Sequence, residues 1–238
     1  MEEYKPREFS QQTSAKADIA AQGFMTKVYM WMGAGLALTA VMAYYVSHSY
    51  TILSMLFSHN GWPFYGLLIA ELGVVFYLSA RIASLSPSTA TALFFVYSAV
   101  NGVTIAPIVL IYTQESIASA FFCAAGMFGA MSVYGTITKR DLSGMKDFLI
   151  MGLIGLIIAS VVNMFMRSER TSLVISVIGV IVFTLLTAYD TQKIRRIGRE
   201  FAGNEEMGAK ASIMGALSLY LDFINMFLYL LRIFGKRR

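Results

Sequence analysis

Two aspartates in apolar segments are the residues of this chain best placed to do chemistry. Asp222 lies in the middle of the last apolar stretch, residues 211–231, where an ionised carboxylate is costly without a partner or water. Steps of three and four residues from it collect Gly208, Ala211, Gly215, Ser218, Asn225, Tyr229 and Arg232. This stripe predicts a helix face that contacts other helices or a water-filled path, because small and polar residues gain little from lipid.

Asp190 ends the preceding apolar stretch and is the second candidate. A helix stop at Gly203 and Asn204, with the next helix starting near Gly208, predicts a turn centred near residue 206. The two aspartates would then lie at similar depth in an antiparallel pair, where they would share a proton and one pKa would be raised. We interpret the pair as a proton relay or a cation site; the structural alternative is a hydrogen-bonded pair that fixes helix register.

Other polar or irregular residues within the apolar windows are weaker candidates. Arg81 ends the second window and either reaches the lipid headgroups or pairs with a carboxylate inside the bundle. Glu71 lies ten residues earlier in the same window, deep enough to be a polar group of the interior. Gly102 and Pro107 predict a kink or a local unwinding of the third window, because proline removes a backbone donor.

The composition indicates which elements must hold these residues. Of the 238 residues, 57% are hydrophobic and 14% charged, against roughly 25% charged in soluble domains. Apolar windows lie at 26–48, 62–82, 88–112, 116–137, 147–166, 171–191 and 207–233. We therefore predict an all-α polytopic membrane protein, with a polar, disordered tail over 1–23 and a seven-helix membrane domain over 24–238.

The basic residues follow the membrane topology. Lys and Arg concentrate at the N-terminal end and in alternate loops, such as Lys139 with Arg140 and Arg195 with Arg196, which predicts that these regions are cytoplasmic. We expect the last segment to cross fully, which places the basic tail on the other side. No nucleic-acid partner is expected, and no nucleotide, because neither a phosphate-cradling loop nor a soluble domain is evident.

Several segments resemble one known family. The C-terminal signature of the Bax inhibitor-1 family of membrane proteins resembles Ser218-Leu-Tyr-Leu-Asp-Phe-Ile-Asn-Met-Phe-Leu-Tyr-Leu-Leu-Arg-Ile-Phe-Gly235, and its sixth helix resembles residues 178–192. Residues 139–143 resemble the loop before its fifth helix, and residues 102–107 its third helix. The resemblance implies seven helices with the last enclosed by the other six. The short termini suit a bacterial member in the plasma membrane, that is, the inner membrane.

The resemblance also implies a function. It predicts a pH-sensitive calcium leak controlled by Asp190 and Asp222, with Arg81 as a latch on the helix-six aspartate. Calcium is expected as the permeant ion and not as a cofactor, held transiently by the two carboxylates with Asn225 and backbone carbonyls. Ser218 and Glu71 are further polar residues of the expected path. The expected partners are the lipid bilayer, calcium ions and protons.

Two alternatives come from other function classes. The first is a non-transporting regulator that docks on another membrane protein, in keeping with the family's association with stress handling and cell death. The second is an intramembrane aspartyl protease, since Asp190 follows a tyrosine. Asp222 lacks the flanking glycines of that protease family, and no proline starts its Pro-Ala-Leu element. We therefore do not expect an enzyme.

Overall fold

The computed structural model describes residues 6–238, with side chains described from residue 18 onward. Within that range the chain is a succession of helices joined by short turns. The α-helices are α1 (Pro6–Ser47), α2 (Tyr50–Leu56), α3 (Trp62–Arg81), α4 (Pro87–Ile111), α5 (Gln114–Ile137), α6 (Lys146–Met166), α7 (Glu169–Glu200) and α8 (Glu205–Phe234). Short 3-10 turns at His59–Gly61 and Ser143–Met145 precede α3 and α6.

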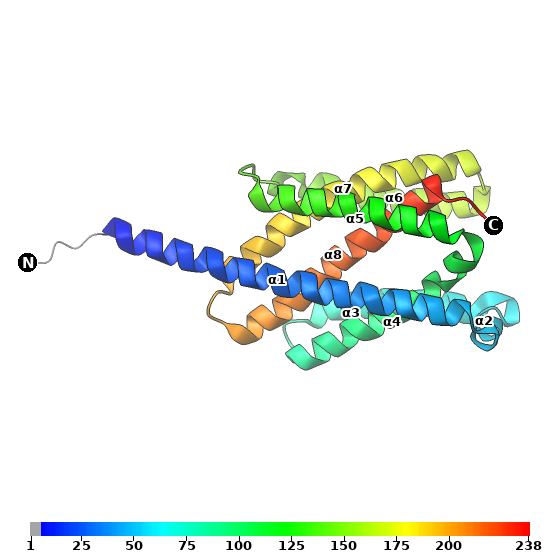
Figure 1. Cartoon of the computed structure of the whole chain (residues 1–238), viewed down its shortest axis with the longest axis horizontal. Helices are drawn as coiled ribbons and strands as arrows, with labels where there is room; N and C mark the ends of the chain where they lie inside the picture. Colours follow the sequence, from blue (N-terminus) through cyan, green and yellow to red (C-terminus); the bar gives the residue numbers. More distant parts are fainter. Residues whose placement is uncertain (1–5) are drawn as a thin grey trace, which may run out of the picture.

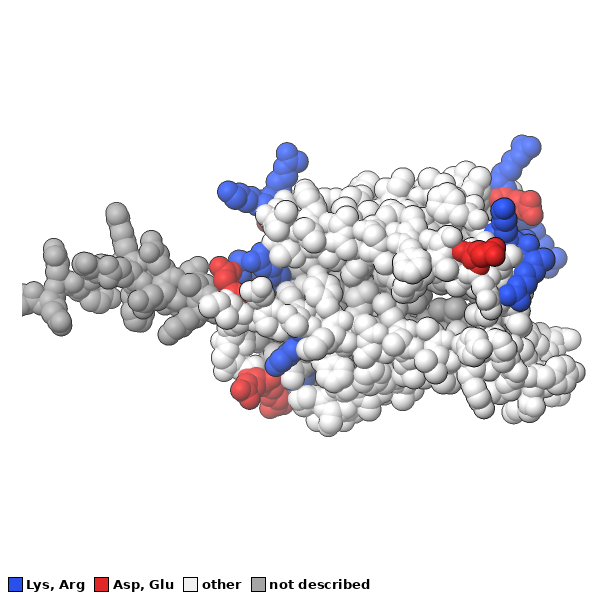
Figure 2. All heavy atoms as spheres, in the orientation of Figure 1, with Lys and Arg blue, Asp and Glu red and all other residues white. Residues whose placement is uncertain are grey.

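Seven of the helical segments in the described range are long and apolar enough to cross a membrane. They cover Asp18–Ser47, His59–Arg81, Pro87–Ile111, Gln114–Ile137, Ser143–Met166, Glu169–Glu200 and Glu205–Phe234. The short helix α2 is not one of them. Figure 2 shows charged side chains at the two ends of the molecule and an uncharged band between them, as a lipid-facing surface requires. The prediction of an all-α protein with seven spans is confirmed.

The N-terminal region differs from the expected disordered tail over 1–23. Residues 1–5 of that tail lie outside the described residues, but α1 begins at Pro6 and runs without interruption into the first span. Ala and Gln are frequent between Ser10 and Gln22, and these residues favour helix. The polar segment therefore extends the first membrane helix, and residue 23 is not a structural boundary.

Helix α8 runs between two groups of helices, with α1, α3 and α4 on one side and α5, α6 and α7 on the other (Figure 1). Two thirds of its apolar window is buried, the largest share of the seven spans. Its main neighbours are α1, α4, α5 and α7, whereas α3 packs chiefly on α4 and α6 on α7. Enclosure by all six other spans is therefore not what the structure has: four helices surround α8, and two lie outside them.

Two glycines allow the close crossings that fix this arrangement. A Cβ on Gly102 of α4 would lie 2.5 Å from the carbonyl oxygen of Thr39 on α1. A Cβ on Gly135 of α5 would overlap the backbone of Ala188 on α7. Helix α4 is continuous through Gly102 and Pro107, so the local unwinding that the sequence allowed does not occur. Gly102 serves close packing, because only a residue without a side chain fits between these backbones.

The α7–α8 turn lies earlier than the sequence predicts. Helix α7 continues to Glu200, and Asn204 caps α8 by accepting a hydrogen bond from the Met207 backbone N–H at 3.0 Å. Gly203 adopts a left-handed conformation with φ of 103° that glycine tolerates best. The turn is therefore centred near Gly203, and the expected centre at residue 206 is wrong because an asparagine cap starts α8 before Gly208.

The C-terminal tail lies at the end of the bundle opposite the N-terminus (Figure 1). The Thr113 N–H donates to the Lys236 carbonyl at 3.1 Å, and the Arg238 N–H donates to the Ile111 carbonyl at 2.9 Å. Ile111 and Thr113 belong to the α4–α5 connection, which three spans separate from the N-terminal end. The last segment crosses fully, as predicted, and its basic tail is fastened to that connection.

Candidate functional site

Asp222 lies at the centre of α8 and is only 4% exposed. Its Oδ2 atom is buried and is the one such side-chain atom without a hydrogen-bond partner among the described residues. Buried polar atoms in native proteins are nearly always hydrogen-bonded, so an orphaned carboxylate oxygen in a membrane helix requires an explanation. The position that the sequence selected is therefore unusual in the structure as well.

Asp190 is half buried and lines a cavity of about 280 Å³. The cavity lies between the α3–α4 turn, the last part of α7 and the first part of α8. Its lining comprises Ile82, Ala83, Asp190, Lys193, Ile194, Ile197, Phe201, Met207, Lys210, Ala211, Met214, Gly215 and Ser218. We refer to it as the Asp190 cavity. Ser218, which was expected to line the path, contributes to it.

The two aspartates lie on facing helices at similar depth. The Phe183 ring of α7 packs against the Tyr229 ring of α8, with centroids 6.0 Å apart. Asp190 lies seven residues after Phe183, and Asp222 lies seven residues before Tyr229. Equal steps along two antiparallel helices bring both residues to within about one helical turn of the same level. The shared proton stays a prediction.

A second cavity, of about 350 Å³, lies on α8 beyond Asp222, towards the C-terminal end. We call it the Asn225 cavity. Its lining comprises Ser160, Asn163, Met164, Ser172, Ile175, Asn225, Leu228, Tyr229 and Arg232. Asn225 was expected to join the aspartates as a calcium ligand. Its Nδ2 instead donates to the Leu221 carbonyl at 2.8 Å, and its side chain lines this separate cavity.

The polar stripe of α8 therefore faces two cavities in succession. Ser218 lines the Asp190 cavity, Asn225 lines the Asn225 cavity, and Asp222 lies on the same stripe between them. Seven residues of helix separate Ser218 from Asn225, a rise of about 10 Å. The barrier between the two cavities is thus short, and the orphaned carboxylate of Asp222 lies within it.

Arg81 does not act as a latch in this conformation. Its side chain is exposed, and it forms no salt bridge with any acidic residue that the structure describes. Arg81 precedes Ile82, which lines the Asp190 cavity, but Arg81 itself does not line that cavity. A long side chain at the end of a span extends to the headgroups more easily than into an apolar interior, which explains its position.

Lys210, which sequence reasoning missed, holds the α3–α4 turn instead. Its Nζ donates to the Ala83 carbonyl at 3.3 Å and pairs with Glu206 at 2.8 Å, although the residue is only 8% exposed. A lysine four residues after a glutamate near the start of a membrane helix was the available signal. The contact itself joins residues 127 positions apart, which no local pattern predicts.

Comparison with known proteins places the chain in a family. A family model described as "Inhibitor of apoptosis-promoting Bax1" matches residues 21–238. The chain belongs to the Bax inhibitor-1 family. The inner membrane protein YbhL of Escherichia coli strain K12 is 50% identical over 218 residues, which cover 91% of this chain and 93% of that protein. An uncharacterized protein of Borreliella burgdorferi is 45% identical over 227 residues, covering 95% and 97% of the two chains.

Glu71 belongs to a different part of this Bax inhibitor-1 family member. It is buried between α3 and α4, where the Thr104 hydroxyl donates to its Oε1 at 2.9 Å. A second group of polar side chains lies next to it: the Tyr220 hydroxyl donates to Asn101 at 3.0 Å and lies 2.6 Å from the Thr39 hydroxyl. These bonds tie α1, α4 and α8 together. Glu71 therefore has a hydrogen-bond partner, and it lines neither the Asp190 cavity nor the Asn225 cavity.

The site offers few ligands for a metal ion. No group of three or more His, Cys, Asp or Glu side chains that would hold a metal occurs in the described region. Calcium takes six to eight oxygen ligands in stable sites, whereas two carboxylates and the Ser218 hydroxyl supply far fewer.

Proposed function

We propose that this protein is a pH-sensitive calcium-leak pathway of the bacterial inner membrane, gated by Asp190 and Asp222. The observation that carries the proposal is the buried Asp222 carboxylate, with its unpartnered Oδ2, on the α8 stripe between the Asp190 cavity and the more polar Asn225 cavity. The inner-membrane location of the relative YbhL and the seven spans support the location. We propose no enzymatic activity.

The physical basis of the gate is the charge of Asp222. When ionised and dry, this carboxylate is unfavourable, so the ionised state favours an arrangement in which water or a cation reaches it from either cavity. When protonated, it is neutral and tolerates a closed, dry barrier. Asp190 acts on this equilibrium through its own charge, because two nearby carboxylates oppose each other's ionisation. The proton therefore biases a closed and an open population of the bundle.

The aspartyl protease alternative receives no support from the site. That chemistry requires the two carboxyl groups to act together on one water molecule. The residues around Asp222 are Leu-Tyr-Leu before it and Phe-Ile-Asn after it, without the glycines that flank the second aspartate of that protease family.

Calcium flux in liposomes tests the proposal. The full chain is reconstituted with a calcium indicator inside the vesicles, and the leak is measured from about pH 5 to pH 8, the range in which proton switches operate. Wild-type protein is expected to leak in a pH-dependent manner. Asp222→Asn and Asp190→Asn are expected to leak at a rate that no longer changes with pH.

The matched control is Asp141→Asn, which neutralises an exposed aspartate in the α5–α6 connection. It is expected to keep the wild-type pH profile. A wild-type profile in both Asp222→Asn and Asp190→Asn contradicts the gate. Wild-type protein that leaks no calcium at any pH, and co-purifies with a stoichiometric membrane protein, supports the regulator alternative instead.

A further inference from the structure

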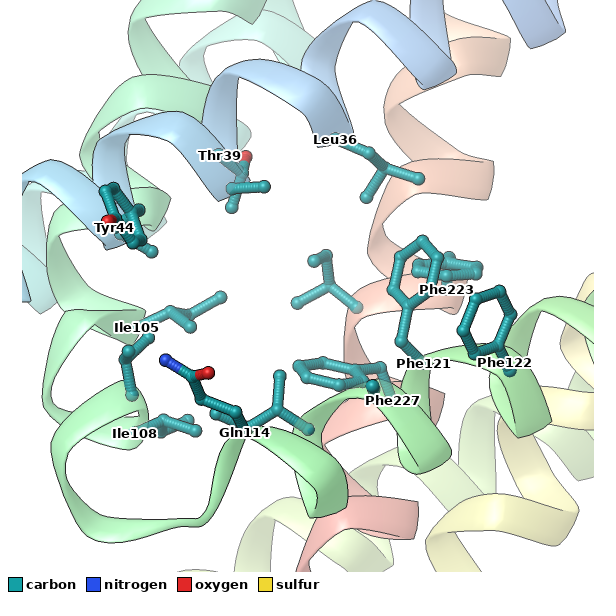
Figure 3. Close-up of a pocket in the computed structure, with 16 residues that line it drawn as sticks. Leu36, Thr39, Tyr44, Ile105, Ile108, Gln114, Phe121, Phe122, Phe223 and Phe227 are labelled. Atoms are coloured by element: carbon teal, nitrogen blue, oxygen red, sulfur yellow. The ribbon is translucent and has the colours of Figure 1, made fainter.

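A third cavity lies on the opposite side of α8 and is almost entirely apolar. It measures about 510 Å³ and is bounded by α1, α4, α5 and α8, a size within the roughly 300–1,000 Å³ of small-molecule sites. Figure 3 shows the rings of Phe121, Phe223 and Phe227 on one side and Leu36 and Thr39 of α1 on the other. We call it the lateral cavity.

The lateral cavity opens towards the bilayer and not towards water. Helices α1 and α5 face each other across it without packing closely together, and Figure 2 shows a hollow between the two halves of this face. Phe122 and Tyr44 line it and are 73% and 61% exposed. Both belong to membrane spans, so the medium at the opening is lipid hydrocarbon.

One end of the cavity lies beside the fastened basic tail. The Gln114 side chain reaches the cavity at this end, with its amide directed inward (Figure 3). The backbone N–H of the neighbouring Thr113 donates to the Lys236 carbonyl, and the Lys236 N–H donates to the Ser116 hydroxyl at 3.0 Å. The Tyr112 ring lies against Gly235. The tail is thus bound to the connection from which Gln114 begins α5.

The tail presents three positive charges at this position. Lys236, Arg237 and Arg238 are exposed, and none forms an ion pair with an acidic residue of the described chain. Glu115 is the acidic side chain of the same connection, so three basic side chains lie near one acidic side chain. Basic residues beside an apolar opening at a span end form the arrangement that an anionic lipid matches, with the phosphate at the charges and a chain in the cavity.

We propose that an anionic phospholipid of the surrounding bilayer binds here, with one acyl chain in the lateral cavity and its headgroup at Lys236, Arg237 and Arg238. The lipid fills a space that the protein leaves open and occupies the face of α8 opposite Asp222. The proposal does not depend on calcium transport, because its observations concern the other face of the helix.

Lipid retention by the purified full chain tests the proposal. The protein is equilibrated in detergent micelles containing equal amounts of phosphatidylglycerol and phosphatidylcholine, and the bound lipids are counted by native mass spectrometry. Wild-type protein is expected to retain about one phospholipid per chain and to prefer phosphatidylglycerol by at least about tenfold. Each Lys or Arg near an anionic lipid surface contributes a preference of about fivefold.

Matched variants separate the two parts of the site. Arg237→Gln with Arg238→Gln is expected to lower the preference for phosphatidylglycerol at least about tenfold, while Arg167→Gln with Arg170→Gln, in the α6–α7 connection, leaves it unchanged. Ala118→Phe fills the lateral cavity and is expected to lower retention of both lipids, while Ala34→Phe, which does not line it, has no such effect. If Ala118→Phe does not fold, Ala40→Leu fills the same cavity from α1.

Four outcomes overturn the proposal. The first is a wild-type protein that retains no phospholipid under these conditions. The second is an unchanged preference for phosphatidylglycerol in the variant with Arg237→Gln and Arg238→Gln. That result would mean that the headgroup does not bind at the tail. The third is lipid retention at the wild-type level in folded Ala118→Phe or Ala40→Leu. That result would mean that no acyl chain occupies the lateral cavity. Equal retention of phosphatidylcholine and phosphatidylglycerol by wild-type protein contradicts recognition of an anionic headgroup.

Discussion

The two faces of α8 differ in polarity. One face carries Ser218, Asp222 and Asn225 past the Asp190 and Asn225 cavities, and the other carries Phe223 and Phe227 against an apolar cavity and the aromatic rings of α5. Both faces belong to one helix, two thirds of whose apolar window is buried. A single membrane helix can therefore present polar groups on one side and an aromatic surface on the other, because its 3.6-residue period assigns neighbouring residues to different surroundings.

Truncation of the aromatic face is expected to have the largest effect on stability. Phe223 is 4% exposed, and its ring centroid lies 5.4 Å from that of Phe121 and 5.7 Å from that of Phe128. Phe223→Ala is expected to lower the free energy of unfolding in detergent by about 3–5 kcal/mol, because it removes these contacts and enlarges a cavity. Phe122→Ala, at the exposed rim, is expected to change it by less than about 0.5 kcal/mol. Equal losses of unfolding free energy in both variants would contradict the assignment of Phe223 to the core and Phe122 to the exposed rim of the lateral cavity.

On the polar face, removal of the charge is expected to stabilise the protein. Asp222→Leu replaces an orphaned buried carboxylate with an apolar side chain of similar volume, which is expected to raise the free energy of unfolding by about 1–3 kcal/mol. The same variant is expected to lose the pH response of the leak. Glu71→Leu serves as the contrast and is expected to give no gain, because Glu71 has a hydrogen-bond partner. A destabilised Asp222→Leu would mean that the carboxylate has a favourable partner in the membrane.

A smaller effect on stability is expected at Lys210, beside the Asp190 cavity. Lys210→Met removes the hydrogen bond that holds Ala83 and is expected to cost about 1 kcal/mol. An added cysteine at Ile82, which lines the Asp190 cavity, should then react about fivefold faster with a polar maleimide, since local opening becomes easier. Cys123 is first replaced by alanine to remove the background. Lys193→Met, which lines the same cavity without holding the turn, is the control; an equal increase there would contradict the role of Lys210.

The smallest effect is expected outside both faces. Asp141 lies in the exposed α5–α6 connection, where the Ser143 backbone N–H donates to its Oδ1 at 2.9 Å and lowers its pKa. A lowered pKa in the folded state means that the carboxylate stabilises the connection above its unfolded pKa of about 3.9 and loses this effect as the pH falls further. Hydrogen exchange in residues 138–145 is expected to rise in acid for the wild type and to be raised already at neutral pH in Asp141→Asn. A pH-independent exchange in the wild type would contradict this.

The sequence predicted the features that depend on local patterns. Hydropathy located the seven spans, and the three-and-four spacing around Asp222 placed Ser218 and Asn225 on one face. The position of the α7–α8 turn was also accessible, because Asn204 followed by two glutamates is a helix-start pattern, but Gly203 and Gly208 were given more weight. That error moved the expected turn by about three residues, which is less than one helical turn.

Features that depend on contacts between distant segments were not predictable. The Arg81 latch was expected from the resemblance, but the structure has Lys210 at the neighbouring turn, through a bond to a residue 127 positions away. Asn225 was assigned to the aspartates because it shares the helix face of Asp222, yet α6 and α7 enclose it in a cavity of its own. The lateral cavity had no sequence signal, since its apolar lining is composed of residues common to every span.

The position of α8 has a consequence for how the protein is made. The ribosome completes α8 after the other six spans, so the contacts of α8 with α1, α4, α5 and α7 form last. Until then Asn101 lacks Tyr220, and the α3–α4 turn lacks Lys210. Insertion of the final helix is therefore the step that completes the bundle and supplies these hydrogen bonds.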